Sequence, residues 1–184
     1  MTIKTYIGDI TDDIDFGQNI AVDTETMGLN FNRDRLCVIQ LSSGQGDAHI
    51  VQIPLGHTDC PMLKSLFENP DITKIFHYAR FDIAALRQHL NIFCQSVYCT
   101  KISSKLCRTY TDKHSLREIC RELLNVDLNK QQQSSDWGTK ELSSEQLNYA
   151  ASDVFYLHQI KEKLDAMLER CLLYTSPSPR DTNP

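Results

Sequence analysis

The chain has 184 residues, 41% of them hydrophobic, which favours one domain with a single core. Its net charge of −5 and pI of about 5.6 disfavour a protein that grips long duplex nucleic acid through many phosphates. No apolar run is long enough to cross a bilayer, and the N-terminus lacks the apolar segment of a secretory signal, so neither a membrane span nor export is expected.

The first third of the chain is rich in β-forming residues. Strands are expected at 3–7 (an edge strand), 20–23 (a central strand), 36–42 and 49–53. The connection at 43–47 has the composition of a hairpin, so the last three strands are expected to form an antiparallel meander. Gly28 lies in a turn and is expected to supply an unusual backbone angle.

The remainder alternates between helical and extended patterns. Helices are expected at 61–67, 80–90, 101–106, 115–124 and from 143 to about 168, with short strands at 71–76 and 97–100 and a polar loop at 130–138. Ser143 with Gln146 forms a capping box, and Leu142 with Leu147 a hydrophobic staple, at the start of the longest helix. This order predicts an α/β sandwich around a mixed sheet.

The distribution of charged residues and of cysteines along the chain adds two observations. Six Lys or Arg residues and two acids lie between Lys101 and Arg121, which suits either a short anionic substrate or a solvated helix face. The seven cysteines are scattered without a C-x-x-C pair. This pattern indicates free thiols in a reducing cytoplasm and argues against a zinc site.

The segment Ile20–Thr26 runs from three apolar residues into two carboxylates spaced two apart. On a strand, Asp23 and Glu25 project from the same face, where they repel each other unless a cation neutralises them. One interpretation is a divalent metal site with hard oxygen ligands. The alternative is a strand end with two solvated acids.

Two further acids have informative surroundings. Asp82 follows a predicted strand at the start of a helix, and Asp153 lies in the longest helix, four residues after Tyr149 and therefore on the same face. An unpaired carboxylate that points inward is unfavourable, and metal ligation removes that penalty. Alternatively, Asp153 faces water and Tyr149 packs in the core.

Together, three segments resemble a known family. Asp-Thr-Glu-Thr (23–26), His-Tyr-Ala-Arg-Phe-Asp (77–82) and Tyr-Ala-Ala-Ser-Asp (149–153) resemble, in this order, the three motifs of the DEDDy 3′–5′ exonucleases. These are the ribonuclease D branch of the ribonuclease H-like superfamily. The resemblance covers roughly residues 3–170. Segments at 100–106, 108–112 and 130–137 are similar to the short, single-domain subgroup called nanoRNase C, and the chain leaves no room for the helical domains of longer ribonuclease D proteins.

The resemblance implies phosphodiester hydrolysis with two Mg²⁺ or Mn²⁺ ions, roughly 4 Å apart, in a ribonuclease H-like fold. Asp23, Glu25, Asp82 and Asp153 would be the metal ligands, with Asp23 bridging both ions. Tyr149 would orient or deprotonate the attacking water. Because a free phenol has a pKa near ~10, the metal must contribute most of the activation.

The resemblance also implies substrate contacts. Thr26 would contact the terminal 3′-hydroxyl, and Leu29 would wedge against the last base, although Leu29 also suits ordinary turn packing. Tyr78 stands where many relatives have Asn, and its ring would be able to stack on a base. His77 is a substrate contact or a structural histidine, and Trp137 a stacking surface or a core residue.

Three functions remain open from the sequence. The first is an exonuclease acting on short single-stranded RNA, down to dinucleotides. The second is a DNA-directed exonuclease of the same chemistry. The third is a non-catalytic nucleic-acid-binding module, whose signature would be the loss of an acid, and none is lost. The subgroup also implies a homo-oligomer, and in that subgroup the chain continues beyond about residue 170.

The C-terminal segment 171–184 has an unusual composition. Cys-Leu-Leu-Tyr-Thr-Ser-Pro-Ser-Pro-Arg-Asp (171–181) resembles the in-frame translation of a transposase-type sequencing adapter. We therefore expect a natural domain over 1–170 followed by an artefactual tail. The alternative is a genuine disordered Ser/Pro tail.

Overall fold

The structure, a computed structural model, describes residues 2–30, 32–128, 132 and 134–174. Its strands are β1 (Thr2–Ile7), β2 (Asn19–Thr26), β3 (Leu36–Ser42), β4 (Asp47–Gln52), β5 (Thr73–Phe76) and β6 (Val97–Cys99). They form one mixed sheet in the order β1-β4-β3-β2-β5-β6. The predicted meander is confirmed, because β2, β3 and β4 pair antiparallel, whereas β1, β5 and β6 join their neighbours in parallel.

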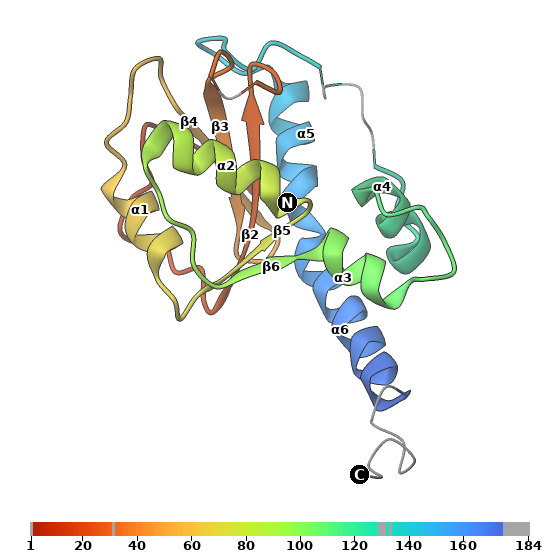
Figure 1. Cartoon of the computed structure of the whole chain (residues 1–184). Coiled ribbons are helices and arrows are strands. Elements are labelled where there is room, and N and C mark those ends of the chain that lie inside the picture. Colours follow the sequence, from red (N-terminus) through yellow and green to blue (C-terminus); the bar gives the residue numbers. More distant parts are fainter. Residues whose placement is uncertain (1, 31, 129–131, 133, 175–184) are drawn as a thin grey trace.

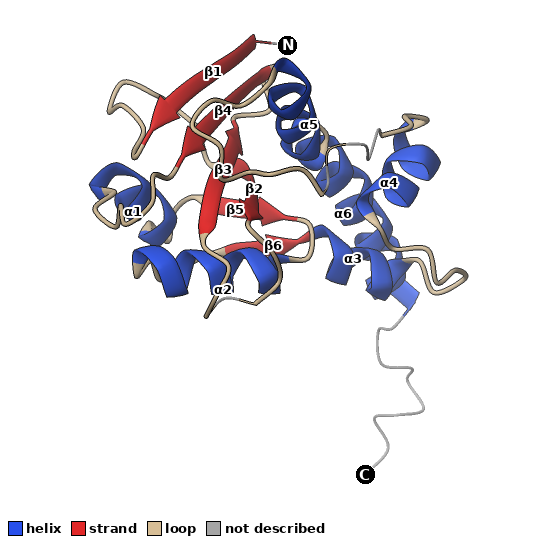
Figure 2. Cartoon of the chain, turned by 90° about the horizontal axis from the view of Figure 1, so that it is seen from above, coloured by secondary structure: helices blue, strands red, loops and turns tan. Residues whose placement is uncertain are grey.

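Helices cover both faces of this sheet (Figures 1 and 2). They are α1 (Pro61–Glu68), α2 (Ala79–Leu90), α3 (Thr100–Cys107), α4 (Leu116–Ile119), the π-helix η1 (Cys120–Leu124), α5 (Ser144–Phe155) and α6 (Leu157–Tyr174). Figure 2 shows α1 and α2 on one side of the sheet and α5 and α6 on the other. The predicted α/β class with a mixed sheet is therefore confirmed. No helix in the described part of the chain is long and apolar enough to span a membrane.

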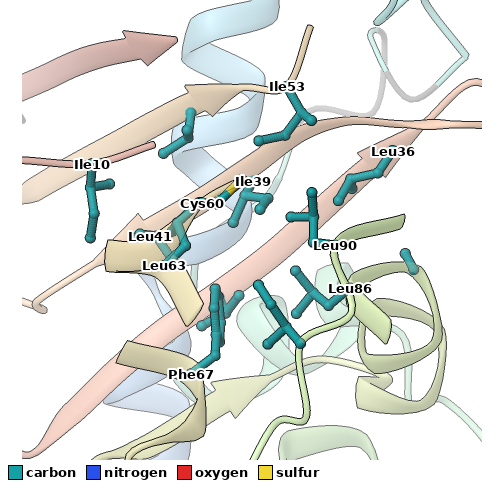
Figure 3. Packing of buried hydrophobic residues seen from close by; sticks show 14 of the residues in the cluster. Ile10, Leu36, Ile39, Leu41, Ile53, Cys60, Leu63, Phe67, Leu86 and Leu90 are labelled. Carbon is teal, nitrogen blue, oxygen red and sulfur yellow. The ribbon is translucent and has the colours of Figure 1, made fainter. Parts of the chain in front are cut away.

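The sheet separates two apolar layers, as the alternation of side chains along its strands requires. Figure 3 shows the first layer, where β3 meets α1 and α2 through side chains that include Ile39, Leu63 and Leu86. The second layer lies between the sheet and α5 with α6. On β2, Val22 belongs to the first layer and Ala21 to the second. Asp23 therefore faces the side of α5.

The capping box predicted for the longest helix is present. The Ser143 hydroxyl accepts from the Gln146 amide at 3.2 Å, and the Gln146 side chain accepts from the Ser143 amide at 2.9 Å. This pair satisfies two backbone donors that lack partners within the helix and fixes the start of α5.

The prediction of one helix from 143 to about 168 is wrong, because the chain turns at Tyr156 and continues as α6. No Pro or Gly marks the turn. The Ser152 hydroxyl donates to the Tyr149 carbonyl at 2.7 Å, a bond that competes with the helical ladder and often bends helices. The turn lets α5 cross β2, β3 and β4 while α6 packs on α3 and β5.

Two other predictions change in detail. The helix expected at 115–124 begins at the Ser115 cap as α4 and ends as the π-helix η1. Helix α6 runs to Tyr174, past its expected end, and Cys171 packs against the second apolar layer. A domain boundary at 170 remains a prediction. Residues 175–184 of the expected tail, and 130, 131 and 133 of the expected loop, lie outside the described residues.

Candidate active site

A cleft of about 710 Å³ opens at the C-terminal end of β2, between the first turn of α2 and the middle of α5. Strands β2 and β5 are adjacent and parallel, so their C-terminal ends reach the same edge of the sheet. In open α/β sheets this is where ligands bind. All four predicted acids and Tyr149 line this cleft.

Three of the four acids converge. One carboxylate oxygen from each of Asp23, Glu25 and Asp153 lies within 4.8 Å of the others. The first two come from β2 by the alternation of a strand, and the third comes from α5, which crosses that strand. The predicted convergence of acids from distant segments is present for these three residues.

Asp82 lies in the same cleft but outside the group of three. Its side chain is 2% exposed and accepts a hydrogen bond from the Thr24 hydroxyl at 2.8 Å. This bond anchors the first turn of α2 to β2. Thr24 was missed by the sequence reasoning, although its place between Asp23 and Glu25 put it on the opposite face of the strand, toward α2.

Burial and mutual repulsion make the acidic cluster unfavourable without a cation. Burial raises the pKa of Asp23 well above its usual range, and the charges of Asp82, Asp153 and Glu25 raise it further. Burial, followed by the charges of Asp153 and Asp82, raises the pKa of Glu25 to about 9. Burial raises the pKa of Asp82 to about 7, against the opposing effect of the Thr24 hydrogen bond.

This donor set fits a divalent cation. Carboxylate oxygens are the ligands that Mg²⁺ and Mn²⁺ prefer, and positive charge removes the repulsion among Asp23, Glu25 and Asp153. The clustered metal-binding groups among the described residues are these three carboxylates. They are not a set of soft ligands that would favour a different metal.

Tyr149 lies one helical turn from Asp153 on α5 and hydrogen-bonds with it. Burial, followed by the charges of Asp153, Glu25 and Asp23, raises the pKa of this phenol. The Trp137 ring lies 5.9 Å from the Tyr149 ring and is 2% exposed, so Trp137 is a core residue that supports the tyrosine. The phenol is therefore held beside the acids in its protonated form.

The four predicted substrate contacts all line the cleft. Leu29 is 83% exposed at the rim, which excludes ordinary turn packing. The Thr26 hydroxyl donates to the Gly28 carbonyl at 2.5 Å, next to a register shift in β2. Bulges of this kind often re-aim side chains beside active sites.

The other two contacts directly precede α2, and Tyr78 is the N-cap of that helix. His77 shares a hydrogen bond with the Thr100 hydroxyl at 2.9 Å, which gives it a structural partner. Tyr78 is 46% exposed and has a left-handed φ of 68°. Such a conformation is strained for an aromatic residue and is concentrated at functional sites.

The basic stretch from Lys101 to Arg121 is not one cationic surface. Arg108 is buried and paired with Glu122, and Arg117 is paired with Asp127 at 2.7 Å. Lys101 lines the cleft with its ammonium 4.3 Å above the Tyr78 ring. In the sequence, the one sign of this contact between Lys101 and Tyr78 was that Lys101 belongs to the basic stretch.

Gly28 is needed for a different reason from the one predicted. Its φ is not positive. Instead, a Cβ there would collide with the Asp34 carboxylate, which accepts a hydrogen bond from the Asn30 amide at 3.0 Å. The glycine therefore permits close packing of the turn that carries Leu29.

Comparison with known proteins agrees with this geometry. Residues 6–169 match the family described as 3′-5′ exonuclease. The chain is 30% identical to ribonuclease D of Acidiphilium cryptum (82% of this chain, 38% of that protein) and 31% identical to Protein RRP6-like 3 of Arabidopsis thaliana (89% and 18%). The chain thus spans less than half the length of these two curated relatives.

Solved structures extend the likeness. Brucella melitensis NrnC bound to pGG is 51% identical, with a TM-score of 0.89 over 92% of this chain and 83% of that chain. The same protein has been solved with bound Mg²⁺. Escherichia coli RNase D, an exoribonuclease, is 30% identical, with a TM-score of 0.74 over 83% and 40%. The chain therefore belongs to the 3′–5′ exonuclease family, in its ribonuclease D-like branch, with the nanoRNase C likeness that its motifs predicted.

Proposed function

We propose that this chain is a metal-dependent 3′–5′ exoribonuclease that hydrolyses short single-stranded RNA, down to dinucleotides. The observation that carries the proposal is the convergence of Asp23, Glu25 and Asp153 within 4.8 Å beside Tyr149, in a chain of the 3′–5′ exonuclease family. The four acids are intact, which disfavours a non-catalytic module.

Asp23, Glu25, Asp82 and Asp153 would hold the cations, two Mg²⁺ or Mn²⁺ ions in this proposal. When bound, such ions stabilise the charge that develops on the attacking and leaving oxygens of a phosphodiester. The hydrogen bond from Thr24 to Asp82 holds that carboxylate at the cleft. The fold of the chain orients the carboxylate oxygens that would hold the ions.

Tyr149 would orient or deprotonate the attacking water. Without a cation, burial and the neighbouring acids raise the pKa of the phenol, and its hydroxyl is able to donate to or accept from a water. In the reaction, a water oxygen forms a bond to the last phosphorus and the P–O3′ bond breaks. The leaving O3′ takes a proton, and a nucleoside 5′-monophosphate is released.

The rim would position the terminal nucleotide. The exposed Leu29 is placed to press on the last base, and the Thr26 hydroxyl oxygen is able to accept from the terminal 3′-hydroxyl. The Tyr78 ring offers a stacking face near the cation of Lys101. These contacts, together with His77 at the cleft wall, remain proposals.

A short substrate is favoured by size. The cleft volume of about 710 Å³ lies in the range of sites that enclose one small ligand. NrnC, which is 51% identical, has been solved bound to pGG. The local charge also fits a short anion. Lys101 and Arg117 line the cleft, and the charge of Arg117 is already balanced by Asp127, so the described residues of the cleft do not present a long row of free cations for a long polyanion.

The deciding experiment is a length series. RNA and DNA oligonucleotides of two to about ten residues would be incubated with the purified chain in Mg²⁺ or Mn²⁺, and the release of mononucleotides timed. Rates that are highest for RNA dinucleotides support the proposal. Equal rates on DNA favour the DNA-directed alternative, and a flat response to length rejects the dinucleotide specificity. Asp153→Asn is the inactive control.

Two finer points complete the proposal. We propose a homo-oligomer, as the resemblance implies, for which light scattering is the test. The exposed side chains Ile102 and Leu106, one helical turn apart on α3, are candidates for burial in it.

We propose a cytoplasmic location because the seven cysteines are free thiols, which persist in reducing compartments.

A further inference from the structure

Gln40, in the middle of β3, is a buried polar residue that the proposed mechanism does not use. Its side chain is 0% exposed. Neither the Nε2 nor the Oε1 atom has a hydrogen-bond partner among the residues that the structure describes. Buried carboxamides are normally paired, so an unpaired one at the centre of a sheet calls for an explanation.

The strand register places Gln40 next to the acidic cluster. Gln40 lies directly opposite Asp23 on the neighbouring antiparallel strand β2 and opposite Ile50 on β4. Opposed residues of an antiparallel pair point to the same face, with Cβ atoms about 4.5–5.5 Å apart. The side chain of Gln40 therefore lies on the same face of the sheet as Asp23, next to it across the strand pair.

Gln40 shares this layer with apolar side chains of the sheet and of α5. They include Ala21, Val38, Ile50, Ala150, Ala151 and Val154. An apolar side chain of similar length, such as methionine, would avoid burying unpaired polar atoms and would be favoured if packing alone determined the residue. The position of the amide beside Asp23 supplies a functional reason for it.

We propose that Gln40 is a positioning residue whose side-chain amide donates a hydrogen bond to the Asp23 carboxylate when that carboxylate holds a divalent cation. The inference rests on the metal site of the proposed function. A carboxylate that coordinates a cation through one oxygen keeps acceptor sites on the other. Hydrogen bonds from neighbouring groups fix the orientation of such ligands, and their loss typically weakens metal binding about 10–100-fold.

The test compares two methionine variants at neighbouring positions of the same layer. Gln40→Met removes the amide, whereas Ile50→Met alters the same layer one strand further from Asp23. Mn²⁺ affinity of the metal-free proteins is measured by isothermal titration calorimetry, with no substrate present. We expect Gln40→Met to bind Mn²⁺ about 10–100-fold more weakly than wild type, to melt no lower than wild type in EDTA, and Ile50→Met to bind normally.

The outcomes distinguish an error in the metal site from an error in the role of Gln40. If wild type takes up no Mn²⁺, the metal site itself is wrong, and the role of Gln40 is wrong with it. If wild type and Gln40→Met bind equally, only the role of Gln40 is overturned. An equal loss in Ile50→Met also overturns it, because the effect is then one of packing.

A second measurement does not depend on the folding of any variant. The side-chain NH₂ resonances of Gln40 are followed in the wild-type protein by NMR during titration with diamagnetic Mg²⁺. We expect one of the two protons to shift downfield and to exchange more slowly with water as the site fills. Resonances that stay unchanged while the backbone signals of Asp23 and Glu25 move would refute the hydrogen bond.

Discussion

Glu25→Gln should stabilise the metal-free protein while it removes metal-dependent stabilisation. Burial and the neighbouring acids raise the pKa of Glu25 from its ordinary value of 4.5 to about 9. At pH 7 the unfolded chain is therefore ionised at this residue and the folded chain is not. Because pH 7 lies 2.5 units above the ordinary pKa of 4.5, and each unit corresponds to about 1.4 kcal/mol, the upper limit of this loss of stability is about 3.5 kcal/mol.

The direction with pH follows from proton binding. Because the folded state binds the extra proton, the stability of the metal-free wild type falls as pH rises from about 4.5 to about 9. The glutamine variant lacks this loss. Its advantage should be below about 1 kcal/mol at pH 5 and about 1–3 kcal/mol at pH 7, since the partly exposed carboxyl is screened by water.

Melting in EDTA at pH 5, 7 and 9 measures the effect. For a chain of this size, the variant should melt about 3–9 °C above wild type at pH 7. Added Mg²⁺ should raise the melting temperature of wild type much more than that of Glu25→Gln. Glu162→Gln, on the exposed side of α6, is the control and should track wild type. An advantage that is absent, or equal at all three pH values, would refute the assignment of Glu25 to a cluster of repelling acids.

Three further predictions test other parts of the structure. Tyr149→Phe should lower kcat about 10²- to 10⁴-fold at saturating Mn²⁺, because the phenol acts on the attacking water; single-turnover rates measure this. Leu29→Ala should raise KM for a dinucleotide about tenfold with no loss of stability, because its side chain is 83% exposed; steady-state kinetics and melting show this. Arg108→Met should cost about 1–3 kcal/mol in urea denaturation without changing metal affinity, because it removes hydrogen bonds to Ser104 and Glu122 remote from the cleft.

Local patterns predicted most of the elements because the sheet and its helices obey simple periodicities. The strands up to residue 53 combine apolar runs with turn residues, and the capping box marks the start of α5. The turn at Tyr156 was missed because no Pro or Gly marks it in the sequence; a Ser hydroxyl bonded to the backbone and two packed aromatic rings lie beside it instead. Such a bend depends on tertiary packing, which a single sequence does not display.

About as much of the candidate site as of the fold could be predicted from the sequence. Spacing and the family resemblance located the acids and Tyr149, because both depend on residue type and order. They did not reveal that the Thr24 hydroxyl holds Asp82 apart from the other three acids, nor that Lys101 lies over Tyr78. Those facts follow from the positions of β2, α2 and α3 relative to one another. Register also decides the environment of Gln40, which in the sequence is one polar residue within an apolar strand.

The parallel pairing of β2 and β5 explains why distant acids meet at all. Parallel neighbours end at the same edge of a sheet, so the helix that follows β5 brings Asp82 to the end of β2, where Asp23 and Glu25 lie. Helix α5 reaches the same edge because it crosses the central strands from the other face. A shift of one residue in the pairing of β2 would turn both of its carboxylates into the apolar layer beneath α1 and α2. The register of this one strand therefore determines both the core and the chemistry, because the same alternation that buries Val22 presents Asp23.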